Sequence, residues 1–229
     1  MNRWIDRLFL LTWGVSVPMM IGALYMVFFH APDEKVMGAA QRIFYFHVPS
    51  AMMTYASVFV LLGGSVGYLW TRDLRWDNLS RAATEVALLF CTVVLITGPI
   101  WAKPAWGVWW TWEARLTSTL ILWLLLLACL MVRNYADSRD LGARLAAIVG
   151  IVAAVDVPII HKAVTWWRGQ HPEVFKPGAD RALDPRMLQT FVFCIITFLI
   201  VFAVMLMLRW RVAQVEDRAD AAVDMLATR

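Results

Sequence analysis

The sequence predicts an all-α, polytopic membrane protein with six transmembrane helices and both termini in the cytoplasm. Hydrophobic residues make up 61% of its 229 residues, and the mean hydropathy is +0.63, a value that soluble proteins rarely reach. A helix needs about 20 apolar residues to cross the hydrocarbon core, and the chain offers six such runs between short polar segments. We therefore expect one six-helix domain, residues 1–229.

The first three spans are predicted at residues 8–29, 43–70 and 82–101. Arg3 and Arg7 precede the first of them, and no small-residue cleavage site follows it, so we expect an uncleaved helix that starts in the cytoplasm. The arginine-containing segment after the second span then also lies in the cytoplasm, as a two-helix hairpin requires. The third span consequently ends outside, at a tryptophan-rich segment.

The other three spans are predicted at residues 116–132, 145–160 and 187–208. This topology gives external segments at about 102–115 and 161–186, and a cytoplasmic tail at about 209–229. It puts twelve of the 21 Lys and Arg residues inside and nine outside. Such a weak asymmetry indicates either an inverted topology or an outer face that uses cations to bind an acidic ligand group, and we favour the second.

Charge, cysteine positions and motif content reduce the number of functional classes to consider. The net charge of +4 is spread over many loops, so the chain lacks the basic stripe typical of nucleic-acid binding. Cys91, Cys129 and Cys194 lie singly in apolar runs, which favours a packing role. The sequence has no phosphate-binding GxxxxGK[ST] loop, so we do not expect it to be an ATPase.

The connection at 101–116, WAKPAWGVWWTWEARL, has an unusual density of indoles. Four tryptophans fall within seven residues: Trp106, Trp109, Trp110 and Trp112. At helical spacing, the first three would share one face with Glu113. An interfacial aromatic belt explains one or two tryptophans at a helix end, whereas four favour a large, flat, partly apolar ligand. Glu113 and Arg115 are candidate polar contacts, although they could equally form an ordinary ion pair.

All four histidines map to the outer face: His30, His47, His161 and His171. Neutral imidazole is a common ligand of haem iron, and a six-coordinate haem needs an axial ligand on each face of the ring. His47 lies at the outer end of the second span, with Pro49 suited to the first turn of a helix. His171 lies in the external loop, and the two could hold one ring from both sides. A single interfacial histidine can also be a solvated loop residue.

The segment WGVWWTWEARLTS resembles the tryptophan-rich WWD motif of the haem-handling proteins of cytochrome c maturation. Together with IFYFHVPSAMM, VPIIH and TWWRGQH, it makes the chain most similar to the small six-helix heme exporter protein C family, CcmC. The family's motif usually ends in Asp, where this chain has Glu113. The acidic charge is thus retained with one more methylene group.

The resemblance implies a function and a set of ligands. It implies transient, non-covalent binding of haem b on the periplasmic face of the bacterial inner membrane, with His47 and His171 as axial ligands of the iron. Haem would pass to the chaperone CcmE, within a complex with the ABC transporter subunits CcmA and CcmB and the small protein CcmD. Candidate cations for the haem propionates are Arg42, Lys103, Arg115 and Arg168.

Three other functions stay open at this point. A bis-histidine cytochrome b-type subunit would carry electrons and keep its haem, usually between ligands buried within spans. A permease that exports haem across the bilayer would need polar residues along a path through the bundle, and Asp156 is one of the few that the spans offer. A purely structural subunit of the transporter would bind no haem.

Overall fold

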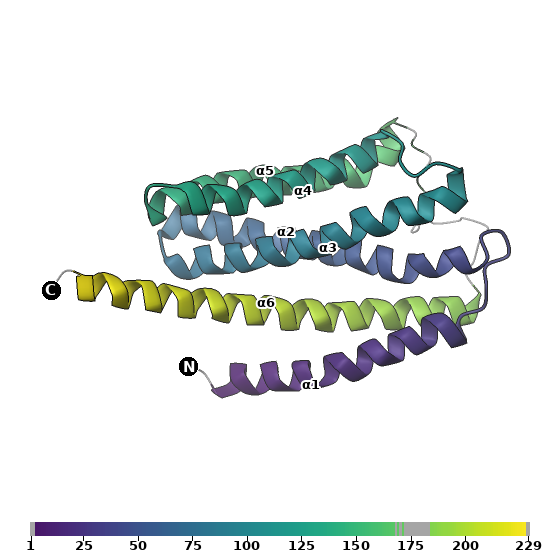
Figure 1. The fold of residues 1–229 in the computed structure, drawn as a ribbon, viewed down its shortest axis with the longest axis horizontal. Coiled ribbons are helices and arrows are strands. Elements are labelled where there is room, and N and C mark those ends of the chain that lie inside the picture. The colour runs from purple at the N-terminus through teal and green to yellow at the C-terminus, as the bar shows by residue number, and fades with distance from the viewer. Residues whose placement is uncertain (1–2, 168, 170, 172–183, 228–229) are drawn as a thin grey trace.

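The computed structural model describes residues 3–167, 169, 171 and 184–227. Six long helices form a single bundle, with both termini at the same end (Figure 1). They are α1 (Arg3–Tyr25), α2 (Phe44–Thr71), α3 (Leu74–Trp106), α4 (Ala114–Tyr135), α5 (Arg139–Trp167) and α6 (Pro185–Ala227). A π-helical turn, η1 (Met26–His30), extends α1, and a 3₁₀ turn, η2 (Ala39–Ile43), precedes α2. All six regions are long and apolar enough to cross a membrane, which confirms the predicted fold class.

The helices extend beyond the predicted apolar spans, so the connections are shorter than expected. The polar segment after the second span is a tight turn in which Arg72 adopts φ 59° and Asp73 caps α3 by accepting a hydrogen bond from the Arg75 amide at 2.9 Å. At the other end of the bundle, α5 continues through Trp167 and takes up the first part of the predicted loop 161–186. The predicted tail 209–229 continues α6 as helix to Ala227.

The core is built around α2, which packs against α3, α5 and α6, whereas α1 packs mainly on α6. Small residues let these helices approach closely. A Cβ atom at Gly64 would lie 2.8 Å from the backbone nitrogen of Ser80, and one at Gly150 would lie 2.9 Å from Ser65 Oγ. Close backbone approach through small side chains is typical of helix packing in membranes. Cys91, Cys129 and Cys194 are buried free thiols, as predicted for packing residues.

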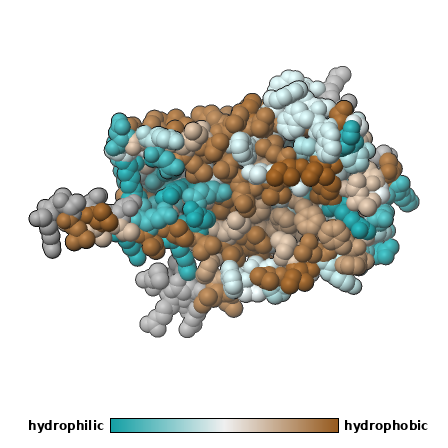
Figure 2. Space-filling model, viewed as in Figure 1, coloured by the Kyte–Doolittle hydropathy of each residue, from teal (hydrophilic) through white to brown (hydrophobic). Residues whose placement is uncertain are grey.

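The surface between the two ends of the bundle is apolar. In the view of Figure 2, hydrophilic side chains gather toward both ends and hydrophobic ones cover most of the middle. Large side chains near the middle of three helices are half exposed or more, including Phe59 of α2 at 59%, Ile96 of α3 at 57% and Leu199 of α6 at 50%. In a membrane this band would face lipid rather than water.

Ion pairs join the helices at the end that carries the termini. Arg133 of α4 pairs with Asp77 of α3, with both side chains almost fully buried, and its guanidinium also donates to Ser80 at 3.2 Å. Arg81 pairs with Glu216 of α6 at 2.8 Å. These contacts fix the relative positions of α3, α4 and α6, so the opposite end is built on a defined scaffold.

Candidate functional site

His47 lies in the first turn of α2. The helix begins at Phe44, so Pro49 is its sixth residue and the prediction that Pro49 lies in the first turn is wrong. The 3₁₀ turn η2 continues directly into α2 and moves the start of the helix toward the N-terminus. His47 Nδ1 lies 2.9 Å from the hydroxyl oxygen of Thr97 on α3, which fixes the orientation of the imidazole ring.

His171 lies beyond the end of α5, with its side chain 20% exposed. Its ring centroid is 6.3 Å from that of His47, and the two ring planes are inclined by 41°. The fold therefore brings together the two histidines that the sequence predicted as a pair. The other two histidines are placed differently, because His30 contacts Gln189 of α6 at 3.3 Å and His161 is exposed on α5.

Two indoles surround His171. The ring centroids of Trp101 and Trp106 lie 6.4 and 6.0 Å from that of His171, and they pack edge to face with each other at 5.3 Å. Trp106 is one of the predicted ligand contacts, whereas Trp101 is not among them. Trp101 follows Thr97 by four residues and so shares its face of α3. Its position at the start of the tryptophan-rich stretch 101–116 is the signal in the sequence that could have identified it.

The predicted helical face of Trp106, Trp109, Trp110 and Glu113 is wrong. The helix α3 ends at Trp106, because Gly107 adopts φ 78° and closes it with a hydrogen bond from its amide to the Lys103 carbonyl at 3.0 Å. The following residues up to Glu113 are not helical. Consequently the indoles diverge: Trp109 is 58% and Trp112 75% exposed, while Trp110 is half-buried with its ring 5.8 Å from that of Trp112.

Glu113 and Arg115 make separate contacts at the start of α4. A carboxylate oxygen of Glu113 lies 3.9 Å from His171 Nδ1. Gly169 allows this approach, since a Cβ atom there would lie 2.9 Å from the other carboxylate oxygen. The Arg115 guanidinium donates to the carbonyls of Ile160 and His161, both at 3.3 Å, and thereby joins α4 to α5.

The surroundings of His171 keep its imidazole neutral. Burial, the positive charge of Arg115 and the nearby His47 together lower the pKa of His171 from its ordinary value of 6.5 to about 3, with burial the largest cause. A neutral imidazole keeps a nitrogen lone pair available for a metal. The ring is thus in the protonation state that metal binding requires at neutral pH.

The candidate cations for an acidic ligand group have protein partners already. Lys103 donates to the Gly107 carbonyl at 2.8 Å and lies 6.0 Å from the ring centroid of Trp109. Arg42 pairs with Asp33 at 2.9 Å. Arg168 lies outside the described residues. The assignment of any of these cations to a propionate stays a prediction.

The histidine pair fits a haem better than a metal bound by protein alone. Two imidazoles on opposite sides of one metal ion, each with a metal–nitrogen bond of about 2 Å, have centroids about 6 Å apart, and the observed separation is 6.3 Å. In the described ranges, no group of three or more His, Cys, Asp or Glu could hold a metal ion. Two nitrogen ligands suit an iron whose other four ligands come from a porphyrin.

Two of the predicted site residues have buried polar atoms without a hydrogen bond. Within the part of the chain that the structure describes, His171 Nδ1 and Trp110 Nε1 are buried and make no hydrogen bond.

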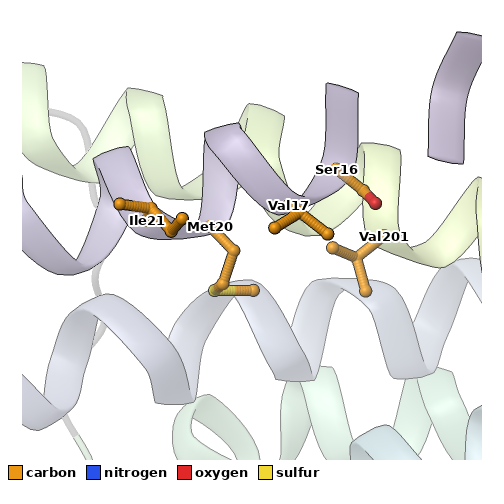
Figure 3. A pocket seen from close by; sticks show the side chains of 5 residues that line it. All are labelled: Ser16, Val17, Met20, Ile21 and Val201. Atoms are coloured by element: carbon orange, nitrogen blue, oxygen red, sulfur yellow. The ribbon is translucent and has the colours of Figure 1, made fainter. Parts of the chain in front are cut away.

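A shallow groove lies elsewhere on the bundle, between α1 and α6, and is lined by Ser16, Val17, Met20, Ile21 and Val201 (Figure 3). It contains none of the predicted site residues, and its lining is largely apolar, as expected for a lipid-facing surface.

The fold and the site together define a class: a polytopic α-helical membrane protein that presents two imidazoles among tryptophans at one end of its bundle. The family model described as CcmC, heme exporter protein C, matches residues 1–224. The chain belongs to this family, which confirms the resemblance found in the sequence. The family handles haem in cytochrome c biogenesis and is a transport family rather than an enzyme family.

Individual relatives agree with this assignment. Heme exporter protein C of Escherichia coli (strain K12) is 35% identical over 79% of this chain and 73% of its own length. The protein of the same name from Haemophilus influenzae is 33% identical, over 82% of this chain and 77% of the relative. A putative cytochrome c biosynthesis ccmC-like mitochondrial protein of Marchantia polymorpha is 34% identical over 65% and 63% of the two chains.

Proposed function

We propose that this protein binds haem b transiently at the periplasmic face of the bacterial inner membrane and passes it to the chaperone CcmE for cytochrome c maturation. His47 and His171 are the axial ligands of the haem iron in this proposal. The observation that supports it most directly is the 6.3 Å separation of the two imidazole centroids, which come from distant parts of the chain. Membership of the heme exporter protein C family supports haem as the cargo.

The other predicted residues have distinct roles in this proposal. Trp106 and Trp110, with the more exposed Trp109 and Trp112, offer indole area to the porphyrin. Glu113 would accept a hydrogen bond from His171 Nδ1, and Arg115 would attract a propionate. The exposed Trp109 and Trp112 put the tryptophan-rich segment at the protein surface, where a partner protein could reach it. A site of this kind suits a protein that must release its ligand.

The proposal includes partners that act on other steps. An ABC transporter complex with CcmA, CcmB and CcmD would surround this chain in the membrane. The chain itself would hold and orient haem without catalysing a reaction. The absence of a phosphate-binding loop in the sequence supports an external source of energy for release.

The first experiment measures haem bound to histidine variants purified after expression with ample haem. His47→Ala and His171→Ala are expected to lose most of the bound haem, with the absorption spectrum of the remainder changed, because each removes one axial ligand. His30→Ala and His161→Ala are matched controls, since these histidines lie outside the pair. Unchanged haem occupancy in either test variant would remove that histidine from the ligand set.

A second experiment distinguishes a protein that transfers haem from one that transports electrons. Haem-loaded protein in detergent is mixed with soluble apo-CcmE domain, and the two are separated and their haem content measured. We expect haem to move to the chaperone, because the exposed Trp109 and Trp112 put the tryptophan-rich segment at the protein surface. Haem that stays bound and is reduced and reoxidised by a quinol would instead indicate a cytochrome b-type subunit.

A further inference from the structure

Thr97 connects α3 to the ring of His47 by a short hydrogen bond. Its hydroxyl oxygen lies 2.9 Å from His47 Nδ1. The same oxygen lies 2.7 Å from the Val93 carbonyl oxygen, one helical turn earlier on α3. The hydroxyl therefore has two close neighbours and one proton to donate.

The Val93 carbonyl determines where that proton lies. A carbonyl oxygen can only accept, so the 2.7 Å contact between two oxygens is favourable only if the Thr97 proton lies between them. The lone pair of the hydroxyl then faces His47, and Nδ1 must be the donor in the 2.9 Å contact. If Thr97 donated to the imidazole instead, two oxygens would face each other at 2.7 Å with no proton between them.

We propose that Thr97 is a positioning residue that holds neutral His47 in the tautomer protonated at Nδ1, so that Nε2 presents its lone pair to the haem iron. This inference rests on the proposed function for the identity of the metal, but the tautomer itself is a property of the haem-free protein. Partners of this kind on the second nitrogen fix the ring orientation and raise the basicity of a metal-binding histidine. Thr97 would therefore affect haem affinity without contacting haem.

The two histidines differ in how they are held. His47 has a hydrogen-bond partner at 2.9 Å, whereas His171 Nδ1 lies 3.9 Å from the nearest carboxylate oxygen of Glu113. His47 is thus set in its ligand orientation before haem arrives. Glu113 is too far from the His171 ring, at 3.9 Å, to fix it by a hydrogen bond in the haem-free protein.

The test compares Thr97→Val with Thr97→Ser. Valine keeps the shape of threonine and removes the hydroxyl, so His47 Nδ1–H loses its acceptor. Haem affinity is expected to fall by about 10- to 100-fold, the usual effect of removing such a partner. Serine keeps the hydroxyl and is expected to retain most of the affinity.

A matched control is available five residues earlier on the same helix. Thr92 donates to the Leu88 carbonyl at 2.7 Å and accepts from Trp123 Nε1 at 2.8 Å, so it makes the same pair of contacts away from any histidine. Thr92→Val is expected to bind haem like the unmodified protein. An equal loss in both valine variants would mean that the hydroxyl acts on helix packing, and it would overturn the proposal.

The tautomer is measured directly on haem-free protein by ¹⁵N NMR of labelled histidines, with His47→Gln used to assign the signal. We expect the His47 signal of an imidazole protonated at Nδ1, and a mixture of tautomers in Thr97→Val. Protonation at Nε2 in the unmodified protein would overturn the proposal even if haem binds. Failure of every form to bind haem would instead contradict the proposed function and leave the tautomer result to decide this inference.

Discussion

The residues that surround His171 determine the protonation state of its imidazole. Its ring is covered by Trp101 and Trp106, and it lies near the positive charge of Arg115. Both effects disfavour the protonated imidazole, which is the form that cannot bind a metal. The protein thus keeps this ring neutral at the cost of stability in acid.

The pKa of His171 gives a prediction about acid stability. Because burial and the neighbouring Arg115 and His47 lower this pKa to about 3, the unfolded chain takes up a proton near pH 6.5 that the folded chain does not accept until about pH 3. The contribution of His171 to the free energy of unfolding is fully present above pH 6.5 and decreases as the pH falls toward 3. The slope of the unfolding free energy should reach about 1.4 kcal/mol for each pH unit.

This slope can be measured on haem-free protein in detergent between pH 7 and 4. His171→Gln should reduce the pH dependence of the unfolding free energy by the contribution of one proton. His161→Gln, at an exposed position, should leave this contribution in place. Parallel stability curves for the unmodified protein and His171→Gln would show that the folded state does not lower this pKa.

At the scale of single residues, the sequence predicted the histidine pair but not its supporting contacts. The WWD resemblance identified His47 and His171. A lone threonine in an apolar run has no distinguishing pattern, so the role of Thr97 depends on the packing of α2 against α3. The divergence of the indoles was missed because Gly107 ends α3 in the middle of a helical spacing.

At the scale of elements, the close contact between α2 and α3 requires the glycine at position 64. The adjacent glycine at position 63 does not take part in this contact. Gly64 faces the backbone of Ser80, whereas a Cβ atom on the adjacent Gly63 would meet nothing within 4 Å. Substitutions at these two glycines therefore distinguish the effect of helix packing from the effect of helix propensity. The contact also sets the height of His47 relative to Thr97, since these residues lie on the same two helices.

Gly64→Ala is expected to destabilise the protein by about 1–3 kcal/mol, because the new methyl group would collide with backbone that cannot move independently. Gly63→Ala should be neutral or slightly stabilising, since alanine favours helix. Thermal unfolding in detergent measures both variants. Equal stability of the two would mean that α2 and α3 separate easily enough to accept a side chain at their contact.

Helix ends were less predictable than helix centres. Apolar runs located all six spans because lipid requires them. Polar residues beyond a span are compatible with helix as well as loop, and α6 continues as helix through a stretch that includes Glu216 and Asp217. Both residues pair with arginines of other helices, which stabilises this extension in a way that hydropathy does not reveal.

At the scale of the whole molecule, both termini lie at one end of the bundle (Figure 1) and the histidine pair lies at the tryptophan-rich end. If the termini are cytoplasmic, as the sequence predicts, the pair faces the periplasm. Single cysteines at exposed positions can test this orientation in intact cells with a membrane-impermeant thiol reagent. Cys91, Cys129 and Cys194 are buried and should not react.

Val108→Cys, in the tryptophan-rich segment, should be labelled from outside. Asp137→Cys, in the turn between α4 and α5, should be labelled only after the inner membrane is opened. The reverse pattern would put the histidine pair in the cytoplasm and exclude direct transfer to a periplasmic chaperone.

The helix α6 is anchored at both ends of the bundle, through Gln189 to His30 and through Glu216 to Arg81. Between these anchors it rises about 40 Å at 1.5 Å per residue, more than the roughly 30 Å of a bilayer's hydrocarbon core. An unbroken helix cannot shorten, so a thinner bilayer must thicken locally around the protein, or the whole bundle must tilt. Either response leaves the spacing of the two imidazoles independent of the surrounding lipid.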